Sequence, residues 1–171
     1  MQSTAPPAPV PALAKLEIVN LDEVVARDRS SRGLVAQYNP RELAVDQAVT
    51  WTPSTTSKGD HPELTFGGGS GKTISLELFF DTFESGEDVH RTHVAPLQEL
   101  LLVMSTTRGE AMKRPPRVMI MWGDDLPRIV AVVVSVNVKY TVFLPGGRPV
   151  RATCAVKFME ASRGNGKGGR V

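Results

Sequence analysis

The stretch RIVAVVVSVNVKYTVFLPGGRPVRATCAVKFME, residues 128–160, decides the fold, because its apolar residues recur at every second position. Every even position from Val130 to Leu144 is apolar, and the odd positions from 135 to 141 are polar. Period two is typical of a β-strand with one buried face, so we expect Val134 and Val136 to face a core. The returning residues 150–160 repeat the pattern, and the residues that we expect to share their face are Ala152, Cys154, Val156 and Phe158.

The two strands would form one unusually long hairpin. Pro145 and Gly146 fit the middle of a type II turn, in which glycine takes the positive φ. Residues 128–144 would span roughly 55 Å at strand rise, far more than a typical strand. The strand must therefore bend, bulge or project past its own domain. Long half-polar strands also leave edges open, which a solitary domain normally avoids, so a ring of copies could cover them.

The rest of the chain adds shorter strands and one helix. We expect strands at 16–19, 33–38, 73–80 and 117–122, and a turn at 123–125. Residues 50–72 are rich in Thr, Ser, Pro and Gly and are predicted to form a long loop, mobile in the free subunit. A helix is expected around 97–104, because apolar residues fall at i, i+3, i+4 and i+7, namely Leu97, Leu100, Leu101 and Met104.

These elements predict a mainly β fold: an antiparallel β-barrel or sandwich with one flanking α-helix. The domain is expected to span residues 14–160. Residues 1–13 form a flexible Pro/Ala-rich N-terminal arm in this interpretation, and residues 161–171 form a flexible Gly-rich tail.

Composition limits the function. The chain has 171 residues, of which 41% are hydrophobic, with 20 basic against 18 acidic residues and a net charge of +2. This balance argues against a broad basic surface for nucleic acid. One cysteine excludes an intrachain disulfide and suits a reducing compartment. No apolar run reaches membrane-spanning length, and the N-terminus does not resemble a secretory signal.

The stretch FGGGSGKTISLELFF, residues 66–80, contains the letters of a phosphate-binding loop but not its spacing. The first glycine of that loop would fall at Phe66, and an alternating strand follows Lys72 instead of a helix. A glycine turn entering a strand is therefore the better interpretation, and a nucleotide hydrolase that uses Lys72 is the weakest alternative.

No other set of residues indicates catalysis. A metal pair could be imagined at His90 and His93 near Asp88, but the only other histidine, His61, is distant in sequence. We therefore interpret the two as solvated loop histidines. Cys154 is predicted to be a buried, inert thiol. Asp124 and Asp125 indicate turn chemistry behind Gly123, and Trp122 is expected in the core. The sequence therefore predicts no enzyme, no metal and no cofactor.

Four segments together resemble a known family. They are YNPREL at 38–43, ELTFGGGSGKTISLELFFDTFESGEDVH at 63–90, PPRVMIMWG at 115–123 and YTVFLPGGRPVRATCAVKFME at 140–160. In this order they resemble the N-terminal domain of contractile injection system tube proteins, from about Leu16 to Glu160. The chain departs from the pattern after the Trp-Gly turn, at Leu126 and Arg128-Ile129. A Gly-rich tail also stands where many members carry a peptidoglycan-binding LysM module.

The resemblance implies a fold like that of phage tail-tube subunits, hexameric rings with a central channel, and a position in the baseplate. We therefore expect a structural ring subunit, the adaptor or tube initiator that joins the spike hub to the inner tube. The alternatives are the main inner-tube subunit, or a β-sandwich that binds carbohydrate or cell wall through Trp51 and the long loop.

The expected partners are copies of the chain itself as a hexameric ring, the spike hub protein, inner-tube subunits and other baseplate components, without nucleic acid or membrane insertion. Assembly is expected in the bacterial cytoplasm as part of a phage tail-like particle, with release from the cell left open. The residues expected at the assembly interface are Lys139, Tyr140, Phe143, Pro145, Gly146, Gly147, Arg151 and Lys157.

Overall fold

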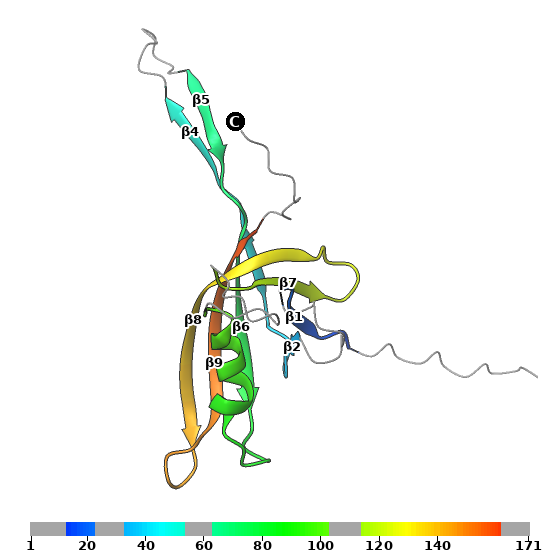
Figure 1. The fold of residues 1–171 in the computed structure, drawn as a ribbon, viewed down its shortest axis with the longest axis vertical. Coiled ribbons are helices and arrows are strands. Elements are labelled where there is room, and N and C mark those ends of the chain that lie inside the picture. The colour runs from blue at the N-terminus through cyan, green and yellow to red at the C-terminus, as the bar shows by residue number, and fades with distance from the viewer. Residues whose placement is uncertain (1–12, 23–32, 54–62, 103–113, 162–171) are drawn as a thin grey trace, which may run out of the picture.

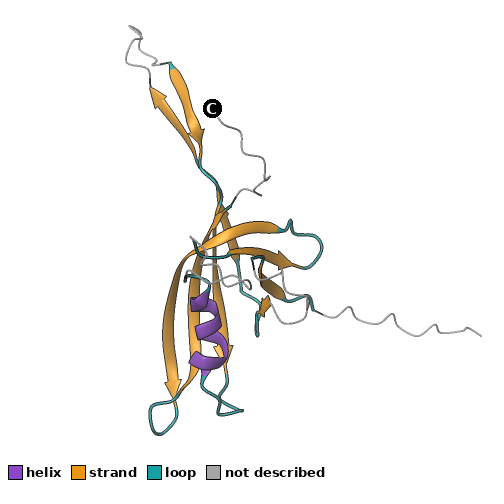
Figure 2. Ribbon diagram, viewed as in Figure 1, coloured by secondary structure: helices purple, strands orange, loops and turns teal. Residues whose placement is uncertain are grey.

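The computed structural model describes residues 13–22, 33–53, 63–102 and 114–161. Most of the described chain is strand (Figures 1 and 2). The elements in chain order are β1 Leu16–Asn20, β2 Gly33–Val35, β3 Leu43–Asp46, β4 Val49–Pro53, β5 Leu64–Gly69, β6 Thr73–Asp81, the π-helix η2 His90–Val94, α1 Ala95–Glu99, β7 Arg117–Trp122, β8 Ile129–Phe143 and β9 Pro149–Glu160.

Seven of the strands form one antiparallel sheet in the order β2-β1-β7-β8-β9-β6-β3. This confirms the mainly β fold and the long hairpin that the sequence predicts. The core row of β9 is fully buried as expected. It lies side by side, on the same face of the sheet, with the buried alternate residues of β6, which are Ile74, Leu76, Leu78 and Phe80.

The turn of the long hairpin also has the expected geometry. Gly147 N donates a 2.9 Å hydrogen bond to Leu144 O, and Gly146 has a φ of 99°. At the other end of β8, Gly123 has a φ of 63° and opens the predicted turn at Asp124-Asp125. Trp122 packs against the core.

A β-bulge in β8 overturns one prediction. Val133 pairs with Phe158 and Ser135 pairs with Lys157, so Val134 is the extra residue between them. Val133 is therefore buried, while Val134 is 51% exposed, and the expectation that Val134 faces the core is wrong. From Val136 to Tyr140 the even positions face the core, and Val136 packs against it as expected. A bulge bends its strand, and β8 curves from beside β7 to beside β9 in Figure 1.

The segment between β2 and β3 joins the two ends of the sheet. Ala36 N donates to Leu16 O at 2.9 Å, which ties the segment to β1. On the β6 side, the Gln37 amide donates to Asp81 O at 2.7 Å and accepts from Asp81 N at 2.9 Å. Tyr38 then forms an isolated bridge with Phe79. The strand expected at 33–38 is thus a three-residue strand followed by this connection.

The helical segment begins earlier than predicted. It runs from His90 through η2 and α1 to Glu99, and it packs on one face of the sheet, as Figure 2 shows. Ala95 N donates to His90 O, and Pro96 next to it has no N–H to donate, so the segment changes from π to α geometry here. Its buried residues are Val94, Leu97 and Leu100, whereas the expected Met104 lies outside the described residues.

The prediction of a long loop at residues 50–72 is largely wrong. Residues 49–53 and 64–69 pair as the hairpin β4–β5, which projects from the sheet in Figure 1; we call it the projecting hairpin. Its strands contain the β-formers Thr50, Trp51, Thr52 and Phe66, and these outweigh the flanking Gly and Pro content. The predicted flexible ends, 1–12 and 162–171, and residues 54–62 of the predicted mobile loop lie outside the described residues.

Candidate assembly surfaces

The part of the sheet below the bulge has one open strand edge, and a second edge that the segment before β3 partly covers. This lower sheet consists of residues 135–143 of β8, together with β9 and β6. The pairing of β8 with β7 ends at Val132, so residues 135–143 have a described neighbour on one side only. On the opposite side, β3 pairs with β6 up to Leu76. Beyond it Tyr38 bridges Phe79, and the Gln37 amide bonds both backbone groups of Asp81. Open edges carry unpaired backbone donors and acceptors, so the β8 edge is a candidate for strand pairing with another chain, whereas the β6 side offers exposed side chains.

One face of the lower sheet is solvent-facing; we call it the outward face. It carries Lys139, Arg151 and Lys157, as the strand parity predicts. Lys139 and Lys157 are exposed. Arg151 instead donates hydrogen bonds to Asp81 Oδ2, from Nη2 at 2.5 Å and from Nε at 3.0 Å. At the end of β8, Phe143 is 56% exposed, and the turn residues Pro145, Gly146 and Gly147 are exposed as well.

Tyr140 differs from the other expected interface residues, because it lies on the core side. Its hydroxyl is 2.6 Å from Nδ1 of His90 and therefore connects β8 to η2. His93 stacks on Phe80, with ring centroids 4.7 Å apart and an interplanar angle of 8°. The interpretation of these histidines as solvated loop residues is thus wrong: both are helical and hold the helix against the sheet. Within the described residues, no His, Cys, Asp and Glu side chains gather as a metal site would require.

Burial shifts three pKa values around this helix and the strands that it covers, and it raises the pKa of Tyr140. It lowers the pKa of His93, an effect that nearby Glu87 partly offsets. It raises the pKa of the Cys154 thiol to about 11. The prediction that this thiol is buried is confirmed, and the raised pKa keeps it in the less reactive protonated form.

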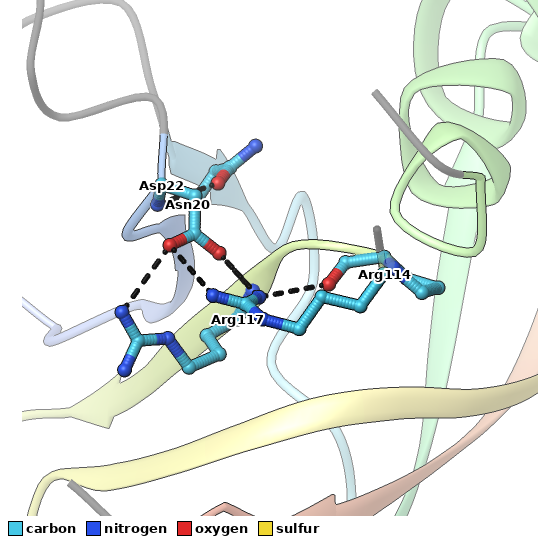
Figure 3. Close-up of polar contacts among 5 residues, drawn as sticks. Asn20, Asp22, Arg114 and Arg117 are labelled. Carbon is cyan, nitrogen blue, oxygen red and sulfur yellow. Dashed lines mark hydrogen bonds and ion pairs between the residues drawn. The ribbon is translucent and has the colours of Figure 1, made fainter. Parts of the chain in front are cut away.

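Asp22 forms a compact ionic cluster at the β1 end of the sheet (Figure 3). It accepts hydrogen bonds from Arg114 Nη1 at 2.8 Å, from the backbone N of Arg117 at 2.7 Å and from Arg117 Nη2 at 3.3 Å. Burial alone would raise the pKa of Asp22, but these bonds from two arginines bring it down to about 2. The cluster is charged at neutral pH and ties β1 to the start of β7.

The projecting hairpin exposes apolar side chains along both strands. Trp51 and Phe66 contact each other edge to face, with centroids 5.5 Å apart, yet each remains more than half exposed. Val49 and Leu64 are exposed as well. An isolated two-stranded hairpin is marginally stable in water, so this one is a strong candidate for burial against another chain.

The base of the projecting hairpin shows the role of Lys72, the lysine of the stretch that resembles a phosphate-binding loop. Lys72 Nζ lies 3.7 Å from Glu160 Oε1, and Lys72 O accepts a 2.7 Å hydrogen bond from Glu160 N. The strand β6 begins at the next residue, so the prediction of a strand after Lys72 is confirmed. The lysine belongs to the junction between the hairpin and the sheet.

Sequence reasoning missed a groove at the β6 edge. Its lining residues include Tyr38, Asp81, Phe83 and Arg151, and its volume is about 400 Å³. The ring of Phe79 lies beside it, 5.5 Å from that of Tyr38. The adjacent residues Phe79 and Phe80 carried a usable signal, because neighbours in a strand point to opposite faces and one of two aromatic side chains must then leave the core. Phe80 is fully buried and Phe79 is 37% exposed.

These features define a β-sheet subunit built for assembly, with an open strand edge and exposed apolar side chains but no described catalytic or metal cluster. The family model for contractile injection system tube proteins matches residues 12–167, and the chain belongs to this family. It is therefore a structural tube-type subunit that assembles with other components of a contractile injection system, a phage tail-like machine. Among curated proteins, none matches the chain. No helix in the described residues is long and apolar enough to cross a membrane.

Proposed function

We propose that the chain forms a closed six-membered ring in the baseplate and joins the spike hub to the inner tube. The observation that carries the ring is that the lower sheet has two unlike sides: an open strand edge at β8, and the segment with Gln37 and Tyr38 along β6. Unlike edges on opposite sides favour a heterologous, head-to-tail contact, and such contacts close into rings. Closure would cover the open edge, which otherwise invites aggregation. The six-fold symmetry comes from the family resemblance.

The projecting hairpin supports contacts outside the ring. It extends beyond the sheet with apolar side chains on both strands, and no described part of the same chain packs on it. A ring that must bind a hub on one side and a tube on the other needs such an axial element. The partners in this proposal are the chain itself, the spike hub protein, inner-tube subunits and other baseplate components. The particle would assemble in the bacterial cytoplasm, without a cofactor.

A second candidate is the main inner-tube subunit, which the family description favours. A baseplate adaptor contributes a single ring, whereas a main tube subunit contributes many stacked rings. Electron microscopy of the purified particle, with this chain labelled, separates the two. One ring between hub and tube supports the adaptor, and labelling along the whole tube shows the main subunit instead.

The ring itself is tested by changing the tip of the long hairpin. Replacing residues 145–149 by a longer Gly/Ser linker should lower the fraction of ring by native mass measurement more than it lowers the melting temperature. The matched control replaces residues 123–125, an exposed turn at the other end of β8, and should leave the ring intact. A parent chain that stays monomeric at every accessible concentration, or a ring that survives the 145–149 change, contradicts the proposal.

A further inference from the structure

The aromatic groove at the β6 edge has the composition of a protein-binding site. We use this name for the groove whose lining includes Tyr38, Phe83 and Arg151, beside the ring of Phe79. Tyr38 is 49% exposed and Phe83 is 54% exposed, and the rings of Tyr38 and Phe79 lie 5.5 Å apart. The guanidinium of Arg151 lies 5.8 Å from the Phe79 ring centroid. Aromatic residues and arginine dominate binding hot spots because they bury large areas with few rotatable bonds.

The groove is held in place by the turn that follows β6. Thr82 Oγ1 donates to Glu87 O at 2.7 Å, and Gly86 N donates to Thr82 O at 2.9 Å. Arg148, from the turn before β9, donates to Gly86 O at 3.1 Å. Phe83 is therefore presented by a well-bonded turn. A fixed aromatic surface loses little conformational entropy on binding.

The charge of the groove selects its partner. Asp81, Glu84 and Glu87 line it, and its basic side chains are Arg151 and the half-buried His93. Asp81 already binds Arg151, so Glu84 and Glu87 leave the groove with an excess of negative charge. A complementary partner carries an exposed aromatic or apolar side chain beside a cation.

The opposite edge of the same sheet carries this combination. Phe143, at the end of β8, is 56% exposed, and Lys139 is exposed four residues earlier on the same strand. Lys139 pairs with Thr153 and Phe143 pairs with Pro149, so both lie on the outward face. Phe79 and Asp81 lie on that same face of β6, at the same end of the sheet. The groove and the Phe143–Lys139 surface thus lie on the same face of the sheet and at the same height along the strands, but at opposite edges.

We propose that Phe143 of one copy inserts into the aromatic groove of the next copy, with Lys139 facing Glu84 and Glu87 across the contact. A second copy is the occupant because the two complementary surfaces belong to one chain and face away from each other. The inference rests on the proposed ring and names the residues that close it. It also explains why a well-bonded turn exposes Phe83 to solvent.

A disulfide test uses full-length chains with one new cysteine each. A mixture of the Phe143→Cys and Phe83→Cys chains should form a mixed disulfide-linked pair under mild oxidation, whereas either chain alone should stay unlinked. Native Cys154 is fully buried and should not compete. The matched control is Leu126→Cys, which is exposed at the turn before β8 and should not link to Phe143→Cys. Linking between two Phe83→Cys chains would overturn the proposal.

The energetic test measures self-association. Phe143→Ser should weaken it by at least tenfold, as expected for a central aromatic contact, while the melting temperature of the monomer stays unchanged because Phe143 is exposed. Leu126→Ser should change neither. Lys139→Glu and Glu84→Lys should each weaken association, and the double change should recover part of the loss. A ring that forms normally in Phe143→Ser overturns this contact but leaves the proposed function standing, whereas a parent chain that never associates overturns both.

Discussion

The molecule contains two antiparallel hairpins that differ in how far their apolar side chains are buried. In the hairpin β8–β9, strand β9 pairs with β6, and the helix covers one face. Cys154 and Phe158 are therefore fully buried. The projecting hairpin β4–β5 has no third strand and no covering helix among the described residues, and Trp51 and Phe66 stay more than half exposed. Both contain aromatic and β-branched residues. The difference teaches that a strand's composition makes it able to pair, while its neighbours decide whether the apolar row is buried.

This contrast separates two kinds of apolar side chain. Those of β8–β9 below the bulge stabilise the subunit on its own, because burial removes them from water within one chain. Those of the projecting hairpin contribute to the subunit only through their mutual contact. Their main contribution is expected when a second chain covers them.

The largest effect is expected at the bulge, where buried and exposed positions are adjacent. Val133→Asp would bury an unpaired carboxylate and should cost several kcal/mol, enough to give insoluble or unfolded protein. Val134→Asp, one residue away and half exposed, should fold with a melting temperature near that of the parent. Soluble yield and circular dichroism of the two variants provide the measurement. Equal loss in both would show that the bulge is misplaced.

A somewhat smaller effect distinguishes the two hairpins directly. Phe158→Ala leaves a cavity in the core and should lower the free energy of unfolding by roughly 3–5 kcal/mol. Trp51→Ala in the projecting hairpin should change it by no more than about 0.5 kcal/mol in the free chain, as is usual for surface substitutions. Denaturant unfolding of the unassembled protein measures both. A large loss for Trp51→Ala would mean that the projecting hairpin packs on its own subunit.

The outcome at these positions also shows what sequence reasoning can reach. Strict alternation in 150–160 predicted the buried row of β9, since a regular ladder keeps parity constant. The run Val132-Val133-Val134 fits either parity, so the bulge that changes the register there left no signal in the pattern. Family resemblance supplied the tube-type assignment, which the family model confirms.

The missed features depend on contacts between distant segments. Gln37 bonds Asp81 across 44 positions of sequence, and this contact places Tyr38 beside Phe79 at the aromatic groove. Local periodicity cannot show such a pairing. The projecting hairpin was missed for another reason: Gly and Pro content suggested a loop, although Trp51 and Phe66 sit opposite each other in a ladder.

The smallest effect concerns the helix that covers β8–β9 and has no counterpart on the projecting hairpin. Burial lowers the pKa of His93 from its ordinary value of 6.5, so the unfolded chain takes up the proton at a higher pH than the folded chain does. Stability should therefore be fullest above pH 6.5 and fall as the pH drops below it, until folded His93 is protonated as well. One such group contributes a slope of at most about 1.4 kcal/mol per pH unit.

This slope can be isolated because the bonded carboxylates act elsewhere on the pH scale. The pKa values of Asp22 and Asp81 are lowered, so their stabilising contributions are lost only in acid below pH 3.8. Denaturant unfolding at pH 7.5 and pH 5.5 should show a loss of stability in the parent and in Trp51→Ala, because the projecting hairpin does not contact His93. In His93→Gln the part of the loss due to this group should disappear. If His93→Gln keeps the full slope of the parent, the ring of His93 does not titrate against the sheet, and the helix is held by the Tyr140 contact and apolar packing alone.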